Sequence, residues 1–126
     1  MGRPQPRPTD AELAILRVLW DRGASTVRQV HEALATRETG YTTTLKLMQI
    51  MAEKGLVKRN ETERSHVYSA SAGEEQTQRQ LVQDLVDRAF GGSAAQLVLR
   101  ALSAEGASDA ELKEIRKLID DYREKR

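Results

Sequence analysis

The chain has 126 residues, which suits one compact domain or two small ones and excludes a large multidomain enzyme. Lys and Arg number 20 and Asp and Glu number 19, so the net charge is only +1. Hydrophobic residues make up 39% but aromatic residues only 4%, and cysteine is absent; this composition favours a mostly helical chain and excludes disulfide bonds, zinc–thiolate sites and cysteine nucleophiles.

The charge is unevenly distributed along the chain. Residues 1–70 hold 11 basic and 8 acidic side chains, a net charge of +3, whereas residues 71–126 hold 9 and 11, a net charge of −2. Residues 1–8 contain all three prolines and two arginines, which predicts a flexible, extended basic arm. No apolar run is long enough for a membrane span or a signal peptide, so we expect a cytoplasmic protein without membrane insertion.

Two helices are predicted after the arm, each from a local capping signal. Thr9 and Glu12 form the pattern of a capping box, and the helix that follows carries an apolar stripe and ends at Gly23. Thr26 and Gln29 repeat the capping pattern at the start of a short second helix. Both helix starts are therefore fixed by residues three positions apart.

A third helix and a hairpin are predicted next. The candidates for the helix N-cap are three consecutive threonines, Thr42, Thr43 and Thr44. The helix ends at Gly55, after which residues 56–60 and 66–70 form two β-prone runs joined by a polar stretch. The change from helical spacing of apolar residues to two β-prone runs predicts a two-stranded hairpin.

Three more amphipathic helices are predicted after Gly73, with breaks at residues 91–92 and 105–107. The predicted fold class is mostly α with a small β-hairpin: a winged helix-turn-helix followed by a C-terminal helical dimerisation region. We place the boundary between residues 9–72, the predicted DNA-binding domain, and residues 73–126, the predicted dimerisation domain.

The polar face of the third helix carries residue types that read DNA. Its candidates for base contacts project together, opposite the apolar face: Thr43, Lys46, Gln49 and Ile50. Gln can pair with adenine, Lys can donate to guanine acceptors, and the Thr methyl can touch the thymine methyl. Further side chains are predicted to reach phosphates: Thr26, Arg28, Tyr41, Thr42, Lys54, Lys58, Arg64 and His66.

Other interpretations stay open beside this one. Threonines before a helix commonly cap it, and polar or basic residues on a helix or hairpin are commonly solvated. The alternative function is a helical protein–protein interaction module that does not bind nucleic acid; salt-dependent binding to generic duplex DNA distinguishes the two.

Catalytic and metal sites are not expected. The chain lacks a G-x-S-x-G elbow, a Walker loop and a dinucleotide-binding turn, so we predict that it is not an enzyme and has no cofactor. Its two histidines, His31 and His66, lack metal-ligand spacing, so no metal site is predicted. We expect His31 to pack beside the apolar stripe of the second helix and His66 to lie on the hairpin.

Three stretches of the sequence resemble one family of bacterial transcriptional regulators. They are TDAELAILRVLW, YTTTLKLMQIMAEKGLVKR and RSHVYSA, and the resemblance to the penicillinase-repressor family (BlaI, MecI and CopY types) covers about residues 9–102. It implies a homodimer with a winged-helix part and a helical dimerisation part that binds a double-stranded palindromic operator and represses transcription. It places the recognition-helix block on residues 41–51 and the wing on residues 58–68.

Two departures from the family pattern limit what the resemblance implies. Copper-responsive members carry a C-terminal cysteine cluster, which this chain lacks, so copper sensing by that route is excluded. β-Lactam-responsive members are inactivated when a membrane sensor protease system causes cleavage of an Asn-Phe bond. The matching position here is Arg100-Ala101, so release by proteolysis would need a protease of different specificity.

The C-terminal helices have too little partner surface within one small chain, which predicts a homodimer. The apolar residues predicted for its interface are Leu81, Leu85, Leu97, Val98, Ile115 and Ile119. Two-fold symmetry would place two recognition helices about 34–36 Å apart, or a multiple of that distance, on DNA. An autonomous three-helix cap on a monomer is the alternative.

Overall fold

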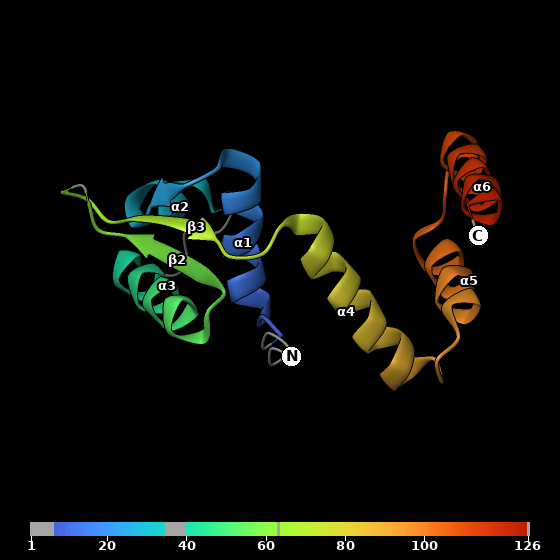
Figure 1. Cartoon of the computed structure of the whole chain (residues 1–126), viewed down its shortest axis with the longest axis horizontal. Coiled ribbons are helices and arrows are strands. Elements are labelled where there is room, and N and C mark those ends of the chain that lie inside the picture. Colours follow the sequence, from blue (N-terminus) through green and yellow to red (C-terminus); the bar gives the residue numbers. More distant parts are fainter. Residues whose placement is uncertain (1–6, 35–39, 63, 126) are drawn as a thin grey trace. The chain divides into compact units, whose positions relative to one another are not determined.

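A computed structural model describes residues 7–34, 40–62 and 64–125. Its elements, shown in Figure 1, are α1 (Asp10–Arg22), β1 (Ser25–Thr26), α2 (Val27–Ala33), α3 (Tyr41–Lys54), β2 (Val57–Asn60), β3 (Val67–Ala70), α4 (Glu74–Ala89), α5 (Ala94–Glu105) and α6 (Asp109–Glu124). The predicted class, mostly helical with a small sheet and a winged-helix front, is confirmed. Most of the predicted N-terminal arm, residues 1–6, lies outside the described residues.

The chain divides into two compact units, Met1–Leu81 and Val82–Arg126. The division falls inside α4, nine residues after the predicted start of the C-terminal domain at residue 73, because residues 73–81 belong to the first unit. Thr77 on this part of α4 is buried, and the indole Nε1 of Trp20 on α1 donates to the carbonyl oxygen of Ala72 at 3.0 Å. The segment leading into α4 is thus attached to the first unit.

Both predicted capping boxes are present. The Thr9 hydroxyl accepts from the Glu12 N–H at 3.2 Å, and the Glu12 carboxylate accepts from the Thr9 N–H at 2.9 Å. Thr26 and Gln29 make the same pair of hydrogen bonds, also at 3.2 and 2.9 Å. These bonds satisfy N–H groups that have no partner within the helix, which fixes where α1 and α2 begin.

The predicted cap of α3 is wrong. The helix begins at Tyr41 with Gly40 as its N-cap, and no side chain caps it. The hydroxyl of Thr44 lies instead against Nδ1 of His31 on α2, at 2.9 Å, and Thr44 is buried. Thr44, one of the three predicted N-caps, therefore packs between α2 and α3 instead of capping the helix. Gly55 ends α3 as predicted, with a left-handed φ of 83°.

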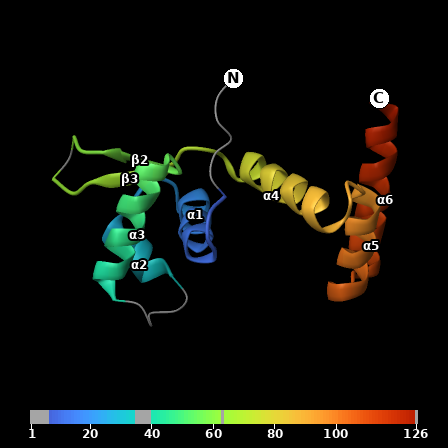
Figure 2. The ribbon, with the colours of Figure 1, turned by 90° about the horizontal axis from the view of Figure 1, so that it is seen from below.

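The sheet has three strands, not the predicted two. Its order is β1-β3-β2 and both pairings are antiparallel. Strand β1 consists of Ser25 and Thr26, which pair with Tyr68 and Val67 of β3. The predicted hairpin is β2–β3, each strand one residue shorter than expected. Figures 1 and 2 show the hairpin extending beyond the helices of the first unit as a wing.

One hydrophobic core holds the helices of the first unit against the sheet. Its buried members are Ile15, Leu16, Leu19, Val27, Val30, Met48, Met51, Leu56, Val57 and Tyr68. They come from α1, α2, α3 and the base of the wing, so burial of one core fixes the position of α3 relative to the hairpin.

The second unit contains the end of α4 together with α5 and α6. The three helices that periodicity predicts after Gly73 are present. Ser93 and Ser108 cap α5 and α6, accepting from Gln96 N and Glu111 N. Neither α5 nor α6, both fully described, has a buried residue. None of the described helices is both long and apolar enough to cross a membrane.

Candidate nucleic-acid interface

Helix α3 turns one face to the core and the other to solvent. Thr44, Met48 and Met51 are buried on the inner face. The side chains predicted to contact bases lie on the outer side, where Thr43, Lys46 and Gln49 are exposed and Ile50 is half-buried. The structure therefore brings the predicted base-contact residues together on an accessible face.

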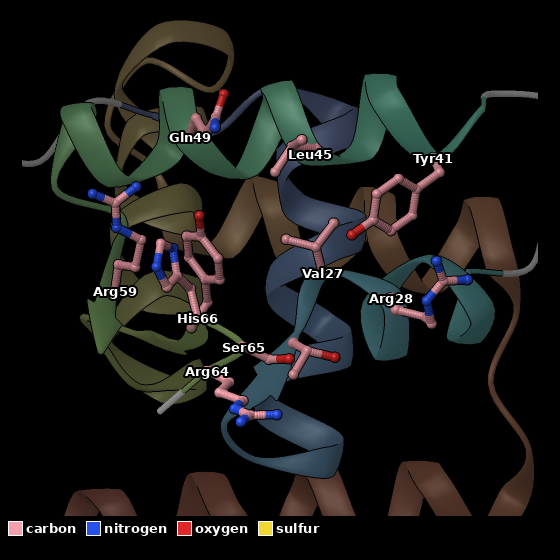
Figure 3. Close-up of a pocket in the computed structure, with 11 residues that line it drawn as sticks. Val27, Arg28, Tyr41, Leu45, Gln49, Arg59, Arg64, Ser65 and His66 are labelled. Carbon is pink, nitrogen blue, oxygen red and sulfur yellow. The ribbon is translucent and has the colours of Figure 1, made fainter. Parts of the chain in front are cut away.

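A hollow of about 380 Å³ lies between α3, the start of α2 and the wing. We call it the α3–wing hollow; Figure 3 shows it, and its lining residues are Thr26, Val27, Arg28, Tyr41, Leu45, Gln49, Arg59, Arg64, Ser65, His66 and Tyr68. It contains three guanidinium groups and, among the residues that line it, no carboxylate. A surface with this excess of positive charge favours binding of an anion.

Six of the twelve predicted DNA contacts line this hollow: Thr26, Arg28, Tyr41, Gln49, Arg64 and His66. Thr42, in the first turn of α3, and Lys58, on β2, are exposed outside the lining. The hydroxyl of Thr26 also caps α2, so the predicted capping role of this residue is confirmed. His66 is exposed on the wing, as expected.

Where α2 and α3 border the hollow, two side chains pack against the ring of Tyr41. The Arg28 guanidinium carbon lies 5.0 Å from the centre of the Tyr41 ring, and His31 meets the same ring edge-on at a centroid distance of 5.9 Å. His31, which was expected to pack beside the apolar stripe of its own helix α2, contacts Thr44 on α3. This packing holds the Arg28 charge at the edge of the hollow (Figure 3).

Lys54, predicted to reach a phosphate, is held by a carboxylate instead. Its ammonium donates to both carboxylate oxygens of Glu12, at 2.8 and 3.0 Å. Burial of Glu12 opposes its ionisation, but hydrogen bonds from Lys54 and Thr9 and the charge of Lys54 outweigh burial and lower its pKa. The lysine charge is compensated here, so we leave Lys54 out of the proposed phosphate contacts.

Arg59 is a site residue that sequence reasoning missed. It lies on β2 two residues after the buried Val57, directly opposite Tyr68 on β3. Its guanidinium pairs with Glu61, and its interactions with Tyr68 and Glu61 raise the pKa of Arg59. The period of a strand puts positions 57 and 59 on one face, a signal that was available in the sequence.

Three helices packed with a three-stranded antiparallel sheet whose hairpin projects as a wing define a winged helix-turn-helix domain. Its third helix presents an accessible polar face beside a basic hollow. Residues 8–121 match the profile of the family described as penicillinase repressor. The transcriptional regulator BlaI of Mycobacterium tuberculosis is 35% identical over 105 residues, which cover 81% of this chain and 76% of that protein. The penicillinase repressor of Staphylococcus aureus is 22% identical over 99% of this chain and 100% of that protein.

The solution structure of the DNA-binding domain of the repressor BlaI is similar in fold, with a TM-score of 0.50 at 22% identity, over 58% of this chain and 90% of that one. The chain belongs to the penicillinase repressor family. The resemblance found over residues 9–102 is thereby confirmed and extended to residue 121. The members named above are regulators and repressors of transcription, which confirms the prediction of a non-enzymatic protein.

Proposed function

We propose that the protein is a homodimeric transcriptional repressor that binds a palindromic DNA operator, with α3 in the major groove and the wing beside it. The observation that carries this proposal is the exposed polar face of α3 next to a hollow with three guanidinium groups and no carboxylate in its lining. Phosphates provide most of the affinity of DNA-binding proteins, and base edges in the groove provide the sequence discrimination.

The proposal divides the contacts into two groups. Thr43, Lys46, Gln49 and Ile50 on the outer side of α3 read bases. Side chains around and beside the hollow contact phosphates: Thr26, Arg28, Tyr41, Thr42, Lys58, Arg64 and His66. Within the described segments Arg28 and Arg64 have no acidic partner, which supports their assignment to the second group.

The dimer belongs to the same proposal. The predicted interface residues Leu85, Val98 and Ile119 are 48%, 41% and 53% exposed in the single chain, and Leu81, Leu97 and Ile115 are half-buried. Exposed apolar residues of this size on amphipathic helices favour contact with a partner. A cytoplasmic location follows from a DNA target and is proposed with it.

Binding of the full chain to duplex DNA at increasing salt tests the proposal. We expect the logarithm of the binding constant to fall linearly with the logarithm of salt, by about 0.9 for each phosphate contact. Arg64→Ala should weaken binding to all sequences and flatten this slope by about one unit per protein contact. Lys46→Ala and Gln49→Ala should lower discrimination between sequences, because a good base contact is worth about 1–3 kcal/mol.

Arg79→Ala is the matched control, since Arg79 is an exposed arginine on α4 that does not line the hollow. It should change neither affinity nor discrimination. Absence of binding at low salt would support the interaction-module alternative. If Arg64→Ala changed sequence preference while Lys46→Ala and Gln49→Ala did not, the two groups of contacts would be reversed.

A further inference from the structure

Arg59 lies where the recognition helix meets the wing. Besides lining the α3–wing hollow, it borders a second hollow that it shares with Gln49, Ala52, Glu53 and Glu61. In Figure 3 its side chain lies on the side of Gln49, across the hollow from Arg28. The side chain is 39% exposed, so the guanidinium is accessible from solvent.

Tyr68 fixes the direction of this side chain. Tyr68 is 1% exposed and is the cross-strand partner of Arg59. Cross-strand pairing places Arg59 and Tyr68 on the same face of the hairpin, where the Tyr68 hydroxyl is the neighbour that raises the pKa of Arg59, so Tyr68 can hold one donor of the guanidinium at the base of the wing. The remaining donors of this planar group can bind a second acceptor without moving the side chain.

Glu61 is that second acceptor in the free protein. Its carboxylate pairs with the guanidinium Nη2 of Arg59, and its side chain is 54% exposed. The turn that carries it is shaped by Asn60, whose side-chain oxygen accepts from the N–H and the hydroxyl of Thr62 at 2.9 and 2.7 Å. A carboxylate and a phosphate offer arginine the same acceptor geometry.

We propose that Arg59 binds a DNA backbone phosphate and that Glu61 occupies the guanidinium until DNA displaces it. Glu61 thus acts as an internal competitor of the phosphate, and Tyr68 is a positioning residue for Arg59. The inference rests on the proposed DNA binding and adds a contact and a tuning residue to it. An Arg59 that is already paired releases fewer counterions on binding than a free one, so Glu61 lowers both the affinity and its salt dependence.

A double-mutant cycle on the binding of generic duplex DNA by the full chain tests this competition. Glu61→Gln should tighten binding about two- to fivefold, the range that corresponds to loss of an exposed ion pair, and steepen the salt slope by about one unit per protein contact. In the Arg59→Ala background the same substitution should give no gain. An equal gain in both backgrounds overturns the competition.

Glu53→Gln is the matched control, because Glu53 borders the second hollow and the substitution removes the same charge. Any gain that it gives should persist in the Arg59→Ala background. Tyr68→Phe keeps the buried ring, and its melting temperature shows whether the core is intact. It should reduce the effect of Arg59→Ala on affinity and on the salt slope; an unchanged Arg59→Ala effect overturns the positioning role.

The two levels of the proposal fail in different ways. A wild-type chain that does not bind duplex DNA at low salt overturns the proposed function and this inference with it. A wild-type chain that binds, with additive effects of Glu61→Gln and Arg59→Ala, overturns the inference alone.

Discussion

Glu12 shows how one side chain serves two structural purposes. It completes the capping box of α1 through Thr9, and it accepts both hydrogen bonds of Lys54 at the end of α3. Its side chain is only 2% exposed, whereas that of Lys54 is 34% exposed. The pair therefore joins α1 to α3, with one partner inside the protein and the other at its surface.

Removal of either partner should destabilise the domain. Lys54→Met leaves the Glu12 carboxylate buried without its cation, and we expect a loss of about 1–3 kcal/mol in the free energy of unfolding, the cost of an unpaired buried polar group. Chemical denaturation at neutral pH measures this loss. Asp10→Asn, an exposed acidic residue in the same helical turn, is the control and should change stability little.

The same pair predicts how stability depends on pH. Because the folded-state pKa of Glu12 lies below its ordinary value of 4.5, ionised Glu12 stabilises the fold above that pH. This contribution is lost as pH falls from about 4.5 through the lower folded pKa. Glu12→Gln should flatten the acid limb of the stability profile; an unchanged acid limb would contradict the assignment.

Contacts between residues distant in sequence were beyond prediction from spacing. Glu12 was identified as a capping residue, which is a local role, but Lys54 lies 42 positions away and its ion pair depends on how α1 packs on α3. The strand period could have placed Arg59 on the same face as Val57, but its partner Tyr68 is brought opposite only by the strand register. The outer face of α3 was predicted because helical periodicity alone defines it.

At the scale of elements, features that depend on residues close in sequence were predicted, whereas features that depend on pairing of distant segments were not. The capping boxes at Thr9 and Thr26 and the glycine end of α3 were predicted because each depends on residues within one turn. The two-residue strand β1 was missed, since its only evidence is a pairing with β3 that is far away in sequence. The start of α3 was misplaced because Gly40 is its N-cap without a side-chain hydrogen bond, while Thr44, one of the predicted caps, contacts His31 instead.

At the scale of the whole molecule, the exposed apolar residues of the C-terminal helices predict association. Leu85→Asp or Ile119→Asp places a charge in the proposed interface, and we expect sedimentation to show a monomer. Binding to a palindrome should then weaken by about 100-fold or more, since a dimer engages both half-sites at an effective concentration that a monomer lacks. Lys117→Asp, an exposed position between apolar positions on α6, is the control and should remain dimeric.

Release of the repressor is proposed to act on the same region. Arg100 and Ala101 are exposed on α5, and a cut there would separate the proposed interface residues before it, including Leu97 and Val98, from Ile115 and Ile119. Intact-mass measurement in the native host under cell-wall stress, while transcription is induced, tests this route and the involvement of a membrane sensor protease. If transcription rises and the chain stays whole and dimeric, a ligand must cause release.

The hydrogen bond between Trp20 and Ala72 makes Trp20 an intrinsic fluorescent probe of this contact. Trp20 is the single tryptophan of the chain, and its indole N–H is bound to the backbone that leads into α4. Detachment of that backbone would expose the indole to water and shift its fluorescence emission to longer wavelength. Emission from one native residue therefore reports, without any added dye, whether the start of the C-terminal half stays attached to α1.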